Sequence, residues 1–272
     1  MNTGGRARLD VELVCRELVR SRAQARAVIA AGRVRVDGRT RSKPSTPIAP
    51  DSVIEVIDAG QQVWVGRAAY KLAAAIEQFG PEGLDVRERT CLDVGASTGG
   101  FTQVLLHHGA RHVVALDVGH DQLAATVSAD PRVTERSGVN IRDVGPTDLG
   151  GPFDVVVVDV SFISLCLIVG PLREQLATGG DLVVLVKPQF EVGRARLGKG
   201  GIVRARRDRL DALRSVLDAA GVAGFDVLDL MPSPIRGAAG NLEYLVWLTT
   251  SPAVRPGAAD LERLIDQMEP PL

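Results

Sequence analysis

The stretch Thr90–Thr102, which reads TCLDVGASTGGFT, constrains the fold of this chain more than any other. An apolar run ends in an acid, glycines follow, and a second apolar run begins after them. This order predicts a strand, a tight turn and a helix, the first unit of a doubly wound α/β sheet. In such a sheet a cofactor lies against open backbone at the carboxyl end of the strand, where a Cβ atom would hold it away.

The side chains around this turn favour a nucleoside cofactor other than a nicotinamide dinucleotide. The dinucleotide fingerprint GxGxxG has a glycine where this chain has Ser97. Asp93 precedes the glycines, where it would repel a pyrophosphate but suit the positive charge of S-adenosylmethionine. Asp117 ends the next apolar run and is placed to accept hydrogen bonds from a ribose. A plain βα turn without a ligand remains the alternative.

Length and cysteine usage limit the class of protein. A chain of 272 residues suffices for one large domain, or for one large and one small. Its three cysteines form no CxxC pair, so we expect neither a disulfide framework nor a metal site. No apolar stretch approaches the roughly 18 residues of a membrane helix, and the first ten residues lack the core of a signal peptide. We expect a cytoplasmic protein without a membrane partner.

The charge is unevenly distributed along the chain. The net charge is -1, but residues 1–43 hold eleven Lys or Arg against four Asp or Glu, a net +7, so the other residues carry about -8. A basic end on a mildly acidic body indicates a module that faces a polyanion. Aromatic residues are scarce at 4%, so contacts to a nucleic acid would depend on Arg and Lys. A solvated basic face is the alternative.

The basic end has the pattern of a small α+β module. Apolar residues recur at helical spacing from Leu9 to Leu18, Ser21 is placed to cap a second helix, and Gly32 to end it. The segment RLDVELVCRELVRSRAQARAVIAAGRVRVDG resembles the RNA-binding module of ribosomal protein S-four, over residues 7–57. The resemblance implies binding of structured RNA by shape and phosphate. The expected RNA contacts are Arg6, Arg8, Arg20, Arg22, Arg26, Arg33 and Arg35.

The remainder predicts a Rossmann-like sheet. Val155–Val158 and Leu182–Val186 are continuous apolar runs, as a parallel sheet covered on both faces requires. Asp159 and Lys187 end these runs, so both should lie at the carboxyl edge of the sheet. A helix cap and a stray surface charge are the respective alternatives. We expect the small module at 1–60, a linker at 61–66, the sheet domain at 67–250 and a tail at 251–272.

Four residues carry a second resemblance. Lys71, Asp159, Lys187 and Glu243 match, in order and strand context, the Lys-Asp-Lys-Glu tetrad of FtsJ-like ribose 2′-O-methyltransferases. With the basic module and the motifs GASTGGFT, DVSFIS, VKPQFEVG and GNLEY, nearly the whole chain resembles the TlyA family of ribosomal RNA 2′-O-methyltransferases. The implied activity is S-adenosylmethionine-dependent methylation of a cytidine 2′-hydroxyl in ribosomal subunits. The implied cofactor contacts are Asp93, Gly95, Ser97, Gly99, Gly100, Asp117 and Asn140.

The resemblance suggests a separate role for each residue of the tetrad. Our hypothesis is that Lys187 is the general base for the ribose hydroxyl, because burial and a nearby cation favour a neutral amine. Asp159 would orient Lys187, and Glu243 would fix Lys71, which positions the hydroxyl or a neighbouring phosphate. Proximity and orientation would supply much of the rate.

Two other functions fit parts of the sequence. The first is a methyltransferase for small molecules or proteins, in which the basic module only localises the enzyme. It predicts that activity survives deletion of residues 1–60. The second is an RNA-binding ribosome-assembly factor with a silent methyltransferase fold, which predicts that no methyl donor binds.

Overall fold

The computed structural model describes residues 7–56, 64–251 and 265. The chain divides into two compact units, Met1–Val63 and Trp64–Leu272, here called the small unit and the large unit. The expected RNA contact Arg6, residues 61–63 of the expected linker, and the expected tail apart from Ser251 and Ile265 lie outside the described residues.

The small unit is an α+β module, as expected. Two helices pack on a three-stranded antiparallel sheet with β2 in the centre, beside a two-stranded pair of β1 and β4. The predicted cap is confirmed, because the Ser21 side chain accepts a hydrogen bond from the backbone N–H of Gln24. Leu18, expected to continue the helical pattern from Leu9, lies beyond the end of α1 and is 39% exposed, whereas Val19 is buried. The elements are β1 (Ala7–Arg8), α1 (Leu9–Cys15), α2 (Arg22–Ala30), β2 (Val34–Val36), β3 (Arg39–Thr40), β4 (Pro47–Ile48) and β5 (Ile54–Val56).

The large unit is built on a seven-stranded sheet of order β11-β12-β10-β9-β6-β7-β8. The strands from β10 to β8 run parallel, and β12 runs antiparallel to both of its neighbours, β10 and β11. The predicted doubly wound sheet is confirmed; the sequence did not reveal the reversed direction of β12, or β11 itself. The strands are β6 (Thr90–Val94), β7 (His112–Asp117), β8 (Val133–Ser137), β9 (Phe153–Val158), β10 (Leu176–Val186), β11 (Asp226–Pro232) and β12 (Tyr244–Thr249).

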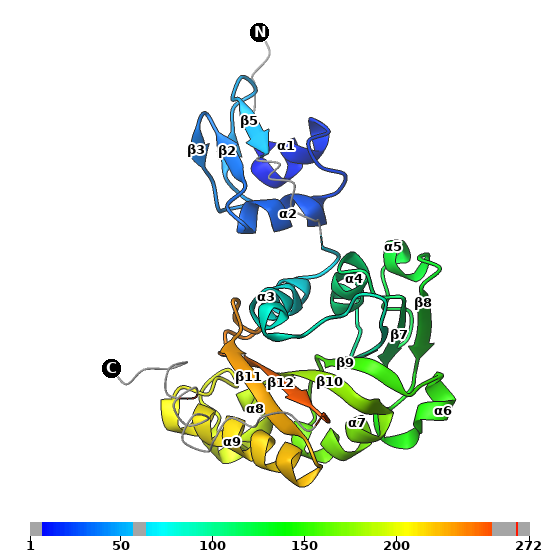
Figure 1. Cartoon of the computed structure of the whole chain (residues 1–272). Helices are drawn as coiled ribbons and strands as arrows, with labels where there is room; N and C mark the ends of the chain where they lie inside the picture. The colour runs from blue at the N-terminus through cyan, green and yellow to red at the C-terminus, as the bar shows by residue number, and fades with distance from the viewer. Residues whose placement is uncertain (1–6, 57–63, 252–264, 266–272) are drawn as a thin grey trace. The chain divides into compact units, whose positions relative to one another are not determined.

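Helices cover both faces of this sheet (Figure 1). Helices α3 and α4 lie on one face, and α7 and α9 on the other. Val155 and Val157 of β9 pack with α3 and α4, whereas Val156 and Val158 pack with α7 and α9, which explains why the whole strand is apolar. The helices are α3 (Ala69–Phe79), α4 (Gly100–His107), α5 (Ala125–Ser128), α6 (Pro146–Leu149), α7 (Val169–Gln175), α8 (Pro188–Glu191) and α9 (Arg206–Val222).

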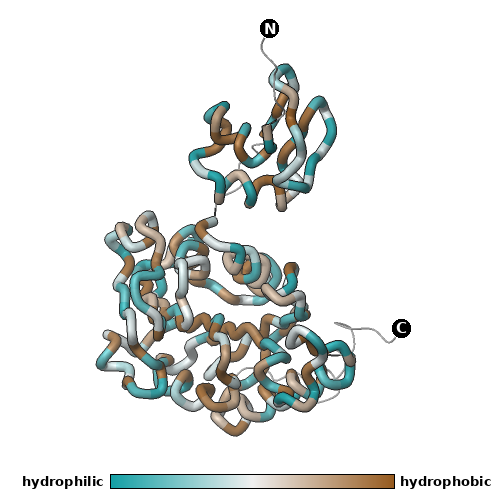
Figure 2. The backbone as a smooth tube through the Cα atoms, turned by 180° about the vertical axis from the view of Figure 1, so that it is seen from behind, coloured by the Kyte–Doolittle hydropathy of each residue, from teal (hydrophilic) through white to brown (hydrophobic). Residues whose placement is uncertain are grey.

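The central strands form the most hydrophobic part of the large unit (Figure 2). Short 3-10 turns connect the outer elements: η1 (Gly80–Glu82), η2 (Ile141–Asp143), η3 (Leu165–Leu167) and η4 (Arg194–Arg196). Trp64, expected in the linker, packs edge-on against the ring of His107 in α4, with ring centroids 5.5 Å apart. Within the described parts of the chain, the helices are all too short or too polar to cross a bilayer.

Candidate functional site

The turn after β6 brings three elements together. Gly95 has a φ of +86°, and a Cβ atom there would lie 2.6 Å from the carbonyl oxygen of Asp159, directly after β9. A Cβ atom on Gly100 would lie 3.1 Å from the backbone nitrogen of Ala69, at the start of α3. The absence of a side chain at these glycines therefore lets the turn pack against the elements that carry Asp159 and Lys71. From the sequence, the glycines were expected only to contact the cofactor.

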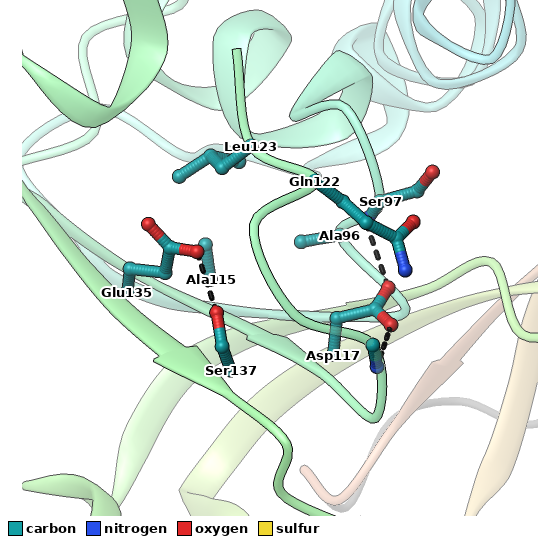
Figure 3. Close-up of a pocket in the computed structure, with 9 residues that line it drawn as sticks. Ala96, Ser97, Ala115, Asp117, Gln122, Leu123, Glu135 and Ser137 are labelled. Carbon is teal, nitrogen blue, oxygen red and sulfur yellow. Dashed lines mark hydrogen bonds between the residues drawn. The ribbon is translucent and has the colours of Figure 1, made fainter. Parts of the chain in front are cut away.

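A pocket opens at the carboxyl edge of β6, β7 and β8 (Figure 3). It encloses about 200 Å³, counting its open mouth. Asp117 reaches into it from the end of β7 and accepts hydrogen bonds from the backbone N–H groups of Ser97, at 2.8 Å, and Gly119, at 2.7 Å. Each carboxylate oxygen can accept a further bond. The lining residues are Ala96, Ser97, Ala115, Asp117, Gly119, Gln122, Leu123, Glu135 and Ser137.

Asp93 is an ionisable group with no exposed surface. Its Oδ2 accepts a hydrogen bond from Thr102 Oγ1 at 2.6 Å, and its Oδ1 is buried without a hydrogen-bond partner among the described residues. Burial raises the pKa of Asp93 to about 7, although the bond from Thr102 opposes the change. Asp93 does not line the pocket, so its expected contact with the cationic end of the cofactor stays a prediction. Asp117, by contrast, lies in the pocket and can accept further hydrogen bonds.

The expected cofactor contacts do not all line this pocket. Ser97 and Asp117 do. Asn140 follows β8, and its side chain caps η2 by accepting a hydrogen bond from the backbone N–H of Arg142 at 3.1 Å. The expected contact of Asn140 with the cofactor stays a prediction.

The four tetrad side chains lie together at the carboxyl edge of the sheet. Lys71 Nζ lies 2.6 Å from Glu243 Oε2 and 4.0 Å from Asp159 Oδ2. Lys187 Nζ lies 2.6 Å from Asp159 Oδ1. The row Glu243–Lys71–Asp159–Lys187 thus alternates in charge, and all four side chains are nearly buried, with 3 to 12% of each exposed. Neither a helix cap at Asp159 nor a stray surface charge at Lys187 describes this arrangement.

Three neighbours of the tetrad were not identified from the sequence. Ser161 accepts a hydrogen bond from Lys187 Nζ at 2.9 Å, and Gln189 donates one to Glu243 Oε1 at 3.3 Å. Phe162 has a φ of +66° and is 91% exposed, and its ring lies 5.2 Å from that of Phe190. The motifs DVSFIS and VKPQFEVG contain all of them, but motif letters do not show which side chains face the lysines.

The buried carboxylate of Asp10 forms ion pairs with three of the arginines that are expected to bind RNA. Its carboxylate lies 2.8 Å from Arg8, 2.9 Å from Arg22 and 3.7 Å from Arg26, whose side chains stay about half exposed. Hydrogen bonds from Arg8 and Arg22 hold the pKa of Asp10 well below its usual range. The module therefore presents three cations around one carboxylate. Of the other expected contacts, Arg20 and Arg35 are exposed and Arg33 is half-buried.

The side chains of the described residues do not form a metal-binding cluster. No group of three or more His, Cys, Asp or Glu side chains among them is arranged to hold an ion.

Two family models match the chain and together span most of it. The model described as FtsJ-like methyltransferase matches residues 64–250. The model described as S4 domain matches residues 7–54.

Relatives resemble both units together. A Mycobacterium tuberculosis protein named 16S/23S rRNA (cytidine-2′-O)-methyltransferase TlyA is 45% identical over 90% of each chain. Hemolysin A of Brachyspira hyodysenteriae is 38% identical over 88% of this chain and 98% of its own. A solved structure of a candidate hemolysin from Streptococcus thermophilus is 35% identical and aligns with a TM-score of 0.72, over 98% of this chain and 96% of the other.

Proposed function

Because the chain belongs to the FtsJ-like methyltransferase family, and within it to the TlyA family, we propose that it methylates a ribose 2′-hydroxyl of ribosomal RNA. The observation that carries this proposal is the meeting of Lys71, Asp159, Lys187 and Glu243 beside the glycine turn. Cytidine is the proposed nucleotide, and the RNAs of both subunits are proposed substrates, after the name of the M. tuberculosis relative. We further propose that the protein acts in the cytoplasm, where ribosomal subunits would be its substrate.

The proposed methyl donor is S-adenosylmethionine. Asp117 would hold its ribose, and Ser97 would lie against the nucleoside. Asp93 is fully buried, so it would act on the cationic end through its charge, and Gly95 would keep the turn close to Asp159. Gly99, Gly100 and Asn140 complete the proposed contacts. When bound, the donor supplies a methyl group on a positively charged sulfur, which makes that carbon electrophilic.

The chain's own residues would prepare the ribose oxygen. Lys187 Nζ is held between Asp159 Oδ1 and Ser161 Oγ, so its position is fixed from two sides. In its neutral form this amine would accept the proton of the 2′-hydroxyl. Lys71, held by Glu243, would donate a hydrogen bond to the same hydroxyl or to the adjoining phosphate. Fixing both lysines in this way lowers the entropic cost of the reaction.

Phe162 offers a surface for the base of the target nucleotide. Its exposed ring lies against Phe190, over which Lys187 Nζ lies 5.9 Å from the ring centroid. Stacking of one base on an aromatic ring contributes about 1–3 kcal/mol. We propose that this surface holds the base once its ribose has reached the lysines.

Tritiated-methyl transfer to separated small and large ribosomal subunits tests the proposal. Subunits from cells that lack the enzyme should accept label from the wild type. Lys187→Ala and Lys187→Arg should each slow transfer by about 100-fold or more, because an arginine supplies the charge but cannot act as the base. Arg111→Ala, at the amino edge of the sheet, is the control and should transfer at the wild-type rate. Near-full transfer by Lys187→Ala would remove the assignment.

The same preparations separate the two alternative functions. An assembly factor with a silent fold would show no binding of S-adenosylmethionine by calorimetry. A methyltransferase for small molecules or proteins would label its substrate in extracts even after ribonuclease treatment. The proposed function requires donor binding together with ribonuclease-sensitive transfer.

A further inference from the structure

A second group of basic residues lies in the large unit. The segment Val192–Arg207, here called the basic segment, carries six cations and no acid. It is unusual in its surroundings, because residues 44–272 together carry a net charge of about -8. The six cations are Arg194, Arg196, Lys199, Arg204, Arg206 and Arg207.

The basic segment is connected to the tetrad at two points. It begins directly after α8, whose first residue follows Lys187. Its far part is fixed by Asn241, which is buried and lies two residues before Glu243. The Asn241 side chain accepts a hydrogen bond from the backbone N–H of Val203 at 2.9 Å and donates one to the carbonyl of Gly201 at 3.0 Å.

A neighbouring loop extends this basic surface. A Cβ atom on Gly237 would lie 2.9 Å from the carboxyl carbon of Glu243, so this loop borders the tetrad. Arg236 directly precedes Gly237 and is exposed, and its guanidinium donates a hydrogen bond to the carbonyl of Gly240 at 3.0 Å. Exposed Arg67 donates in turn to the carbonyl of Arg236. Neither of these bonds neutralises a guanidinium.

Most cations of the basic segment are likewise not neutralised. Arg196 pairs with Asp208 and Asp211. Elsewhere in the large unit, Arg87 and Arg132 also pair with a nearby carboxylate. By contrast, four exposed cations of the segment form no ion pair within the described residues: Arg194, Lys199, Arg204 and Arg207.

We infer that the basic segment is a second RNA-contact surface, which binds phosphates of the strand that carries the target nucleotide. The inference rests on the proposed function, and it adds a contact within the catalytic unit itself. Exposed cations attract the phosphates of a nucleic acid, and such contacts supply much of the affinity without depending on base sequence. Asn241 is then a positioning residue, since it holds this surface in place relative to Glu243 and the lysines.

The paired variant Lys199→Ala/Arg204→Ala tests the inference in the full-length protein. Arg87→Ala/Arg111→Ala removes the same charge from the amino edge of the sheet and serves as the matched control. Filter binding to ribosomal subunits over a range of salt, methyl-transfer kinetics and calorimetry with S-adenosylmethionine are measured for each protein.

The basic-segment variant should bind subunits about tenfold more weakly, and the slope of log affinity against log salt should fall by about 2. Its KM should rise in parallel, while its affinity for the methyl donor stays at the wild-type value. Wild-type affinity and salt slope in this variant, or an equal loss in the control, would overturn the inference. A wild-type protein that binds subunits but transfers no methyl group would instead contradict the proposed function. In that case the binding measurement would still show whether the basic segment contacts RNA.

Discussion

The tetrad residues depend on one another because each charged side chain lies beside one of opposite charge. Lys71 lies between the carboxylates of Glu243 and Asp159, and Asp159 lies between the two lysines. Burying a charge is costly unless a partner compensates it, and in this row each lysine is buried beside a carboxylate. Removal of one member leaves its partner buried and uncompensated.

Lys71→Ala should therefore destabilise the fold by about 3 kcal/mol, because the nearly buried carboxylate of Glu243 loses its ion pair. Lys71→Met/Glu243→Leu removes both charges at similar volume and should recover most of that loss. Both proteins should be inactive. Urea denaturation followed by fluorescence measures the difference, and a double variant no more stable than Lys71→Ala would contradict the account.

Asp93 should make stability depend on pH in a defined direction. Its pKa is raised from 3.8 to about 7 in the folded protein, mainly by burial, so the folded state binds the proton more tightly than the unfolded state. This contribution to stability is fully present below pH 4 and is lost as the pH rises through 7. The loss is on the order of 4 kcal/mol for the roughly three units of difference.

Asp93→Asn removes this titration while keeping an acceptor for Thr102. The unfolding free energy of the wild type should fall relative to that of Asp93→Asn between pH 4.5 and pH 8, as measured by urea titration at each pH. Parallel pH curves for the two proteins would show that Asp93 does not titrate in this range.

A site residue could be predicted from the sequence where both its chemical type and its place at the end of a strand were informative. Asp159 and Lys187 could be predicted because each ends an apolar run, and parallel strands bring such ends to one edge. The hydrogen bond from Lys187 to Ser161 and the cluster of arginines around Asp10 could not. These contacts depend on side-chain directions, which spacing in the sequence does not determine.

At the scale of elements, the site depends on how closely loops approach the sheet edge. The glycine turn lies against the end of β9 through Gly95. Glu191, at the end of α8, accepts hydrogen bonds from Ser164 Oγ at 2.5 Å and from the backbone N–H of Leu165 at 2.9 Å. These bonds fix the loop that carries Ser161 and Phe162 against the element that follows Lys187.

Gly95→Ala tests the approach of the turn to β9. The new Cβ atom would lie 2.6 Å from the carbonyl oxygen of Asp159, so the turn must move, and both donor affinity and methyl transfer should fall by at least tenfold. Gly224→Ala is the control, because Gly224 has nearly the same φ, +85°, with open space around its Cβ position. That variant should lose stability by about 1 kcal/mol and keep wild-type kinetics. Equal kinetic losses in both would assign the effect to backbone strain alone.

Element types were more predictable than their directions. The apolar runs of β9 and β10 identify buried strands, because both faces of each are covered. Strand β12 is also apolar on both faces, so its pattern could not show that it runs antiparallel. Strand β11 is mostly half-buried at the sheet edge and lacks a strong pattern.

At the scale of the whole molecule, two units contribute different parts of the proposed function. The small unit carries arginines grouped around Asp10, and the large unit carries the pocket and the tetrad. The resemblance to known families predicted both units, since each has its own motifs.

The paired variant Arg22→Ala/Arg26→Ala tests whether the small unit contributes to RNA binding. The Asp10 carboxylate keeps its bond to Arg8, so the fold should persist while two exposed cations are lost. Affinity for ribosomal subunits should fall, and the slope of log affinity against log salt should decrease by about 2. Donor affinity, measured by calorimetry, should not change. Unaltered binding to subunits would contradict an RNA-binding role of these arginines.

The chemical position of the transferred methyl group tests the central claim most directly. Ribosomal RNA labelled by the wild-type protein with tritiated methyl groups is hydrolysed in alkali, which cleaves only next to a free 2′-hydroxyl. If the tetrad activates a ribose oxygen, the label must appear in alkali-resistant dinucleotides. Label in mononucleotides would mean that a base is methylated, and the arrangement of Lys71, Asp159, Lys187 and Glu243 would then need another explanation.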